Sequence, residues 1–178
     1  MISLLLASFI LTPSSGHIVS EDQNTEVWFY VFSNEHNKVY GPTQVNGGNA
    51  VKCWTHPDWT AQIPGAEWIW DSYRVLKPDG EEVAEFLNDF VVEGKIISAL
   101  LEIAADNSVW VKINGKETDC FKAGGSFTVD SQFVCDVTKY VETELNDIEF
   151  KVVNLAGGGG EDGNPAGLLY KLSIRTLV

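Results

Sequence analysis

The sequence predicts an all-β protein, an antiparallel β-sandwich or jelly roll of about nine or ten strands. Apolar residues alternate with polar ones along several short runs, and turn residues recur between these runs at regular spacing. No segment carries a convincing long helical pattern. The composition of 16 Gly, 6 Trp, 5 Tyr and 9 Phe with a single Met fits a β domain with many turns.

The clearest of these patterns runs from Ile96 to Gly115. Alternate apolar residues share one face along Ala99–Ala105, and the alternation resumes along Val109–Ile113 after Asp106–Asn107 interrupts it. Two period-two runs joined at Asp-Asn predict an antiparallel hairpin. Asn114–Gly115 then supplies a second tight turn, because Asn and Gly both tolerate positive φ.

Other strands are expected wherever β-branched and aromatic residues lie between turn clusters. These segments are Glu26–Phe32, Lys38–Tyr40, Ala50–Trp54, Glu67–Trp70, Tyr73–Leu76, Asp147–Asn154 and Leu168–Leu177. Glu82–Glu93 is ambiguous because its apolar residues fit both helical spacing and alternation. Its turn-rich flanks favour a strand. Within Phe133–Val141, Asp136 is an acceptable N-cap for a single helical turn.

Length and charge limit the kind of protein this is. A chain of 178 residues is long enough for one domain with a sizeable core, expected over residues 17–178. The net charge of −13 argues against nucleic acid and anionic membrane surfaces as partners, since both carry negative charge. No stretch reaches the roughly 20 apolar residues of a membrane-spanning helix.

The N-terminal segment, residues 1–16, allows two interpretations. Met1–Leu11 is apolar and uncharged, and Thr12–Gly16 follows as a run of small residues. This order is typical of a signal peptide, with His17 as the first residue of the mature protein. Alternatively, the segment is retained as an apolar strand that pairs with a sheet edge of its own or a neighbouring subunit.

Cysteine usage favours an extracellular or cell-surface location. Cys120 and Cys135 flank a segment whose central Gly124–Gly125 lets the chain double back, so a disulfide is expected between them. It would close a loop of about 15 residues and add roughly 3 kcal/mol. Cys53 is then left over, either buried as a small hydrophobic residue or available to a partner. The alternative is three reduced thiols in a cytosolic protein.

Several segments together resemble a known β-sandwich family. They are Gly65–Trp70, Glu85–Val92, Ala99–Gly115, Cys135–Val141 and Val152–Leu168. This series resembles the galactose-binding-domain-like β-sandwich found on bacterial cell-surface and secreted proteins, and Trp54–Trp59 matches a tryptophan pair often seen just before it. The resemblance implies a jelly roll that binds sugars, attaches to surfaces or packs beside other domains.

The candidate ligand-binding residues are Trp54, His56, Asp58 and Trp59, which cluster in a proline-containing loop. Sugar recognition needs flat aromatic faces against the C–H surface of a pyranose, with carboxylates or amides beside them for the hydroxyls. A structural role is expected instead for at least one of Trp68 and Trp70, because both flank Ile69 in an expected strand.

Two other polar clusters are weaker candidates. Glu161, Asp162 and Asn164 in the glycine-rich segment offer oxygen ligands suited to calcium, although their spacing matches no dedicated motif. Asp106 and Asn107 could ligate a sugar or calcium, but turn formation is the simpler role. No other cofactor is expected.

Catalysis is not expected, because the sequence has no Gly-x-Ser-x-Gly elbow and no His-Glu-x-x-His motif. The favoured function is a non-catalytic extracellular carbohydrate-binding or adhesion module, with glycans or cell-surface components as partners. The alternative is a self-assembling structural subunit of a surface layer or extracellular filament. That alternative uses the apolar N-terminal segment for contact between subunits and predicts a homo-oligomer or polymer.

Overall fold

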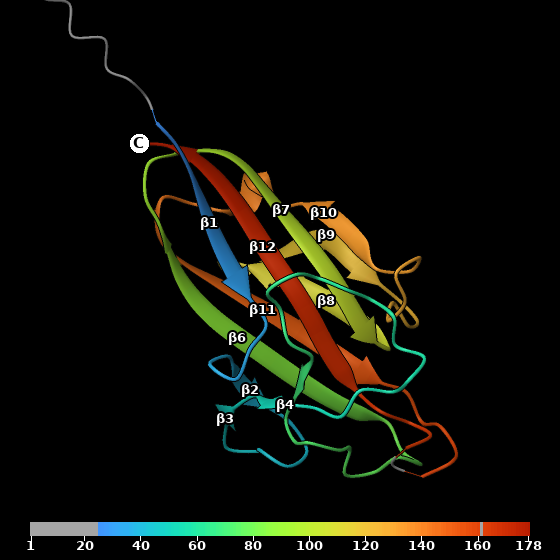
Figure 1. Cartoon of the computed structure of the whole chain (residues 1–178). Coiled ribbons are helices and arrows are strands. Elements are labelled where there is room, and N and C mark those ends of the chain that lie inside the picture. Colours follow the sequence, from blue (N-terminus) through green and yellow to red (C-terminus); the bar gives the residue numbers. More distant parts are fainter. Residues whose placement is uncertain (1–24, 161) are drawn as a thin grey trace, which may run out of the picture.

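The computed structural model describes residues 25–160 and 162–178, and it confirms the antiparallel β-sandwich. Two sheets pack face to face, and Figure 1 shows β12 running between β1 and β7 in the nearer one. The described residues contain one helical element, a single turn of 3-10 helix, and no helix long and apolar enough to cross a membrane. The signal peptide or N-terminal strand expected over residues 1–16 lies outside the described part of the chain.

The first sheet has the strand order β10-β7-β12-β5-β4, with β1 also paired to β12. Its strands are β1 (Glu26–Phe32), β4 (Val51–Lys52), β5 (Ile69–Trp70), β7 (Lys95–Asp106), β10 (Phe133–Asp136) and β12 (Gly167–Leu177).

The second sheet has the strand order β3-β2-β6-β11-β8-β9, and all of its pairs are antiparallel. Its strands are β2 (Lys38–Tyr40), β3 (Gly48–Asn49), β6 (Glu82–Val92), β8 (Ser108–Ile113), β9 (Lys116–Lys122) and β11 (Glu144–Asn154). The ambiguous segment is therefore a strand, as its flanks indicated. Ala84 and Phe86 of β6 are fully buried between the sheets.

The expected hairpin over Ile96–Ile113 is wrong. β7 pairs with β10 and β12 in the first sheet, whereas β8 pairs with β9 and β11 in the second. Asp106–Asn107 is thus a corner at which the chain crosses from one sheet to the other. Alternation along the sequence indicates which face of each strand is buried. The alternation pattern does not differ between two strands that pair in one sheet and two strands that lie in opposite sheets, so it could not exclude a hairpin here.

The core is formed by the inward residues of both sheets. Leu101 and Ile103 of β7 are fully buried, and Phe150 packs against Tyr170 with ring centroids 4.2 Å apart. Both Trp68 and Trp70 are buried, so the structural role expected for at least one of them extends to the pair. Residues that point away from this core therefore form the two outer faces of the sandwich.

Three local features depart from or refine the expectations. Tyr73–Leu76 is not a strand but part of the loop between β5 and β6. β9 was not expected, because its polar sequence lacks apolar alternation. Asn114 and Gly115, with φ of 53° and 67°, make the tight turn between β8 and β9 as expected. The helical turn lies at Thr138–Tyr140 with Val137 at its N-cap instead of the expected Asp136, whose carboxylate accepts a hydrogen bond from the Thr138 N–H at 3.0 Å.

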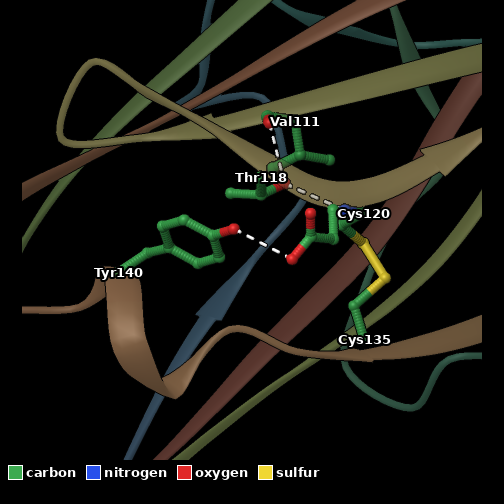
Figure 2. Close-up of a disulfide and its surroundings, with 6 residues drawn as sticks. Val111, Thr118, Cys120, Cys135 and Tyr140 are labelled. Atoms are coloured by element: carbon green, nitrogen blue, oxygen red, sulfur yellow. Dashed lines mark hydrogen bonds between the residues drawn. A yellow bond between two sulfur atoms is a disulfide. The ribbon is translucent and has the colours of Figure 1, made fainter.

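The expected disulfide between Cys120 and Cys135 is present and joins the two sheets. Figure 2 shows it bridging β9 of the second sheet and β10 of the first, and the Cα atoms are 5.7 Å apart. Cys53 is buried, and burial raises the pKa of its thiol to about 12. Of the two alternatives for Cys53, the structure supports the buried hydrophobic residue, because thiolates and not thiols react.

Candidate functional site

The sequence-predicted residues lie at one end of the sandwich, which we call the loop end. It consists of the Trp54–Trp59 loop, the Asp106–Asn107 corner and the glycine-rich segment 155–166. The indole Nε1 of Trp59 donates a hydrogen bond to Oδ2 of Asp106 at 3.2 Å, and Leu155 N–H donates one to Oδ1 of Asn107 at 2.7 Å. These bonds tie the three segments together.

Trp59 closes the core at the loop end. Its ring lies 4.4 Å from the ring of Trp68 and 6.3 Å from that of Phe127, measured between centroids. A Cβ atom at Gly167 would lie 2.9 Å from both tryptophan rings, so glycine at this position lets them pack on β12. Trp59 is partly buried, its ring packs on two aromatic neighbours, and its N–H is already bonded to Asp106.

Asp106 holds Trp59 in this position through a buried carboxylate. Burial raises the pKa of the Asp106 carboxyl to about 6, while the hydrogen bond from Trp59 and the charge of His56 act in the lowering direction. The amide of Asn107 also donates to this carboxylate. Asp106 and Asn107 therefore serve the corner itself, which is the simpler of the two roles expected for them.

The structure brings the side chains of Trp54 and His56 together with that of Arg74, and the backbone N–H of Trp59 donates to the carbonyl of His56 at 2.9 Å. The two rings meet edge to face with centroids 5.8 Å apart, and the guanidinium carbon of Arg74 lies 4.8 Å from the Trp54 ring centroid. His56 Nδ1 accepts a hydrogen bond from the backbone N–H of Asp58 at 3.1 Å. The carboxylate of Asp58 lies 3.6 Å from the same nitrogen and points into solvent.

The glycine-rich segment is held by protein contacts. Asp162 forms an ion pair with Arg74, and the side-chain amide of Asn164 donates to the carbonyls of Pro78 and Leu155. Within the described residues no group of three or more His, Cys, Asp or Glu could hold a metal. A calcium site here stays a prediction that depends on Glu161, which lies outside the described residues, because the one described carboxylate is already paired with a cation.

A second surface, which we call the sheet groove, lies on the outer face of the second sheet. It has a volume of about 310 Å³ and crosses β6, β11, β8 and β9. Its lining residues are Glu85, Leu87, Trp110, Lys112, Glu117, Glu149, Phe150 and Lys151. Sequence reasoning did not identify these residues as a site.

Strand register arranges the groove residues in two rows across the strands. In one row, Leu87 lies opposite Glu149, which lies opposite Lys112, which lies opposite Glu117. Such cross-strand neighbours have Cβ atoms about 5 Å apart, so each row is a continuous strip of side chains.

The second row runs parallel to the first and ends on aromatic rings. Glu85 lies opposite Lys151, which lies opposite Trp110, which lies opposite Phe121. The rings of Trp110 and Phe121 are 5.1 Å apart between centroids. The partly exposed indole therefore forms one wall of the groove, beside charged side chains on the neighbouring strands.

Charged groups in the groove differ in how they are partnered. Lys112 Nζ lies 3.3 Å from the carboxylate of Glu117, and Lys151 Nζ lies 5.9 Å from the Trp110 ring centroid. Within the described part of the chain, the carboxylates of Glu85 and Glu149 have no hydrogen-bond or ion-pair partner. The groove thus combines an aromatic surface with carboxylates that can accept hydrogen bonds from a ligand.

One signal in the sequence pointed to this surface. Trp110 alternates with the core residues Val109 and Val111, so an aromatic ring was expected on the polar face of its strand. The rest of the groove comes from β6 and β11, which contribute through pairings between distant parts of the sequence. Such pairings cannot be read from alternation within single strands.

No protein-family model matches the chain, and no curated protein matches it in sequence. Similar solved structures include a family 35 carbohydrate-binding module from Clostridium thermocellum, at 11% identity and a TM-score of 0.43, over 81% of this chain and 97% of that one. They also include an α-L-rhamnosidase from Streptomyces avermitilis complexed with L-rhamnose, at 19% identity and a TM-score of 0.46, over 80% of this chain and 13% of that one. A β-glucuronidase from an uncultured Clostridium sp. is similar at 11% identity and a TM-score of 0.47, over 94% of this chain and 31% of that one.

The chain therefore spans less than a third of each of these two enzymes and nearly the whole of the carbohydrate-binding module. At these identities the likeness assigns no ligand to this chain, and the fold itself is established by the strands described above.

Proposed function

We propose that this protein is a non-catalytic carbohydrate-binding module that holds a glycan in the sheet groove. The observation that carries this proposal is the combination, in one groove, of the partly exposed Trp110 ring with the carboxylates of Glu85 and Glu149, which have no partner among the residues that the structure describes. A pyranose ring has an apolar C–H face that packs on an aromatic ring, and hydroxyl groups around its edge that donate to carboxylates.

A binding role suits these carboxylates better than catalysis does. Glycoside hydrolysis needs one carboxyl group that stays protonated near neutral pH, which proteins achieve by burying it in an apolar site. Glu85 is exposed and Glu149 is half-buried on the outer face of a sheet. Neither carboxyl group is buried as that acid would be, and the oxygens of both can accept hydrogen bonds from hydroxyl groups.

Secretion to the outside of the cell is part of the same proposal. The Cys120–Cys135 disulfide supports it, because disulfides persist in oxidising compartments and are rare in the cytosol. A location at the cell surface, where the module would adhere to glycans, follows from the proposed ligand. Identification of the intact protein in culture medium or on intact cells tests this part.

The binding proposal is tested by titrating the protein with a panel of neutral, acidic and amino-sugar oligosaccharides while measuring heat. We expect Trp110→Ala to weaken binding of the responding glycan by about tenfold or more, since it removes the aromatic wall of the groove. Trp28→Ala is the matched control, because Trp28 is 47% exposed on the outer face of the other sheet. A panel without any response, or equal binding by the Trp110 variant, contradicts the proposal.

A second candidate function, assembly into a surface layer or filament, is supported by β1. Trp28 and Tyr30 are about half exposed on this strand, and within the described residues β12 is its only partner strand. An exposed strand edge with large apolar residues favours pairing with another chain. Sedimentation of the full chain beside a chain starting at His17 tests this function, which requires the full chain to associate through residues 1–16. If both chains sediment as monomers, this function is contradicted.

A further inference from the structure

From the cross-strand rows of the sheet groove we infer that its ligand is a neutral, linear glycan of at least three sugar units, lying across the strands. This inference rests on the proposed carbohydrate-binding function. It names the class of glycan from two features of the surface, the spacing of its aromatic rings and the balance of its charges.

Aromatic rings stand at both ends of the row that contains Trp110. Tyr40 of β2 lies opposite Glu85 of β6, so the row extends past β6 to β2, its fifth strand. Its ring is 45% exposed and packs over Gly47, where a Cβ atom would lie 2.6 Å from it. Because Gly47 has a φ of +82°, glycine is favoured there, and the turn beneath the Tyr40 ring keeps its shape.

The distance between these rings sets the length of the ligand. β2 and β8 are separated by three inter-strand spacings, with β6 and β11 between them. Neighbouring strands lie about 4.8 Å apart, so the side chains of Tyr40 and Trp110 start about 14 Å from each other. A single sugar ring covers one aromatic side chain, whereas a chain of three or more units reaches from one to the other.

The charges between the rings favour a neutral ligand. Charges of opposite sign are neighbours within each row: Lys112 lies between Glu149 and Glu117, and Lys151 lies between Glu85 and Trp110. The protein as a whole carries a net charge of −13. A polyanionic glycan would meet carboxylates in the groove and a repelling field around it, and a polycationic one would meet the ammonium groups of Lys112 and Lys151. Hydroxyl groups can bond to both kinds of side chain.

The experiment is a calorimetric titration with neutral β-linked gluco-, xylo-, manno- and galacto-oligosaccharides, each from monosaccharide to hexasaccharide. Oligogalacturonates and chitosan oligosaccharides serve as the anionic and cationic series. In the neutral series that binds, we expect the affinity to rise about tenfold or more between disaccharide and tetrasaccharide and then to level off.

Tyr40→Ala tests the second aromatic contact. We expect this variant to bind the tetrasaccharide about as weakly as the wild type binds the disaccharide, and to bind the disaccharide unchanged. Tyr30→Ala is the matched control, since Tyr30 is 51% exposed on the outer face of the other sheet. Circular dichroism of both variants establishes that each is folded.

The possible outcomes separate the inference from the proposed function. If a monosaccharide binds as tightly as the tetrasaccharide, if a charged series binds more tightly than every neutral one, or if Tyr40→Ala leaves tetrasaccharide binding unchanged, the inference is wrong while sugar binding stands. If no series binds, or if Trp110→Ala binds as the wild type does, the proposed function fails as well.

Discussion

The loop end and the sheet groove each place a tryptophan beside carboxylates, yet the two tryptophans are used differently. Trp59 donates its N–H to Asp106 and packs against Trp68 and Phe127. Trp110 contacts Phe121 and Lys151 and keeps part of its ring exposed. Its N–H has no hydrogen-bond partner among the residues that the structure describes.

The difference follows from where each residue sits relative to the core. The two sheets of a sandwich leave the ends of the core open, so an aromatic residue in a loop at that end is drawn in to cover it. A residue on the outer face of a strand points away from the core whatever its size. A tryptophan on that face stays available to a ligand.

Replacement of Trp59 is expected to have the largest effect on stability. Trp59→Ala removes a packed indole and one of the two side-chain donors to the buried Asp106 carboxylate, so we expect a loss of about 3 kcal/mol in the free energy of unfolding. Trp110→Ala should cost less, about 1 kcal/mol, because its ring is partly buried against Phe121 on the outer face of the sheet and not in the core. Urea unfolding of both variants measures this contrast.

Ligand binding should show the reverse order. In the temperature range where Trp59→Ala is folded, we expect it to bind the glycan as the wild type does, whereas Trp110→Ala loses affinity. If Trp59→Ala loses affinity in its folded state while keeping wild-type stability, the roles assigned to the two tryptophans would have to be exchanged.

The disulfide offers a second way to compare the two regions, because it ties β9 at the edge of the groove to β10 of the other sheet. Cys120→Ala together with Cys135→Ala removes a link across 15 residues of sequence. We expect the free energy of unfolding to fall by about 3 kcal/mol, owing to the greater freedom of the unfolded chain. β9 carries Glu117 and Phe121 at the edge of the sheet, so a weaker glycan affinity should accompany this loss.

Thermal unfolding and calorimetry of the double variant give both quantities, and Cys53→Ala is the control for loss of a thiol. A double variant with full stability would mean that β9 and β10 are held in place by their sheets without the covalent link. Unchanged affinity in a destabilised variant would mean that β9 contributes little to the groove.

Much of the fold could be predicted from alternation and turn residues. The predicted bounds of β1 and β2 agree with the structure, because the β-branched and aromatic runs there end at clear turns. The hairpin across Asp106–Asn107 was wrong because partners of a strand are chosen by packing between distant segments. For the same reason β9, a polar strand completed by the disulfide and by pairing with β8, was not expected.

The candidate site was harder to predict than the fold. The Trp54–Trp59 loop carried suitable residue types for sugar recognition, but nothing in it reveals that Trp59 would be needed to cover the core and bond Asp106. The groove needs Glu85, Trp110 and Lys151, which lie in three strands and come together only when β6, β11 and β8 pair. Register between strands, which the sequence does not state, is what creates that site.

The smallest expected effect concerns the titration of Asp106. Its folded-state pKa of about 6 lies above the ordinary value of 3.8, so folding strengthens proton binding at this carboxyl. The resulting stabilisation is present in full below about pH 4 and is lost as the pH rises through about 6, with a size on the order of 2 kcal/mol. The free energy of unfolding of the wild-type protein should therefore receive a larger contribution from this group as the pH falls from about 7 to about 5.

Asp106→Asn isolates this contribution, because the side chain no longer titrates and its amide oxygen can still accept the hydrogen bond from Trp59. The bond from the Asn107 amide is lost at every pH, which lowers the whole profile of the variant without changing its slope. Burial also raises the pKa of Glu82, but that group is present in both proteins and cancels in the comparison. Urea unfolding between about pH 4 and about pH 7 should give a flatter profile for the variant, with glycan affinity equal to that of the wild type at each pH. Parallel profiles would mean that the Asp106 carboxylate is solvated in the folded protein. Lowered affinity at unchanged stability would place the ligand at the loop end instead of the sheet groove.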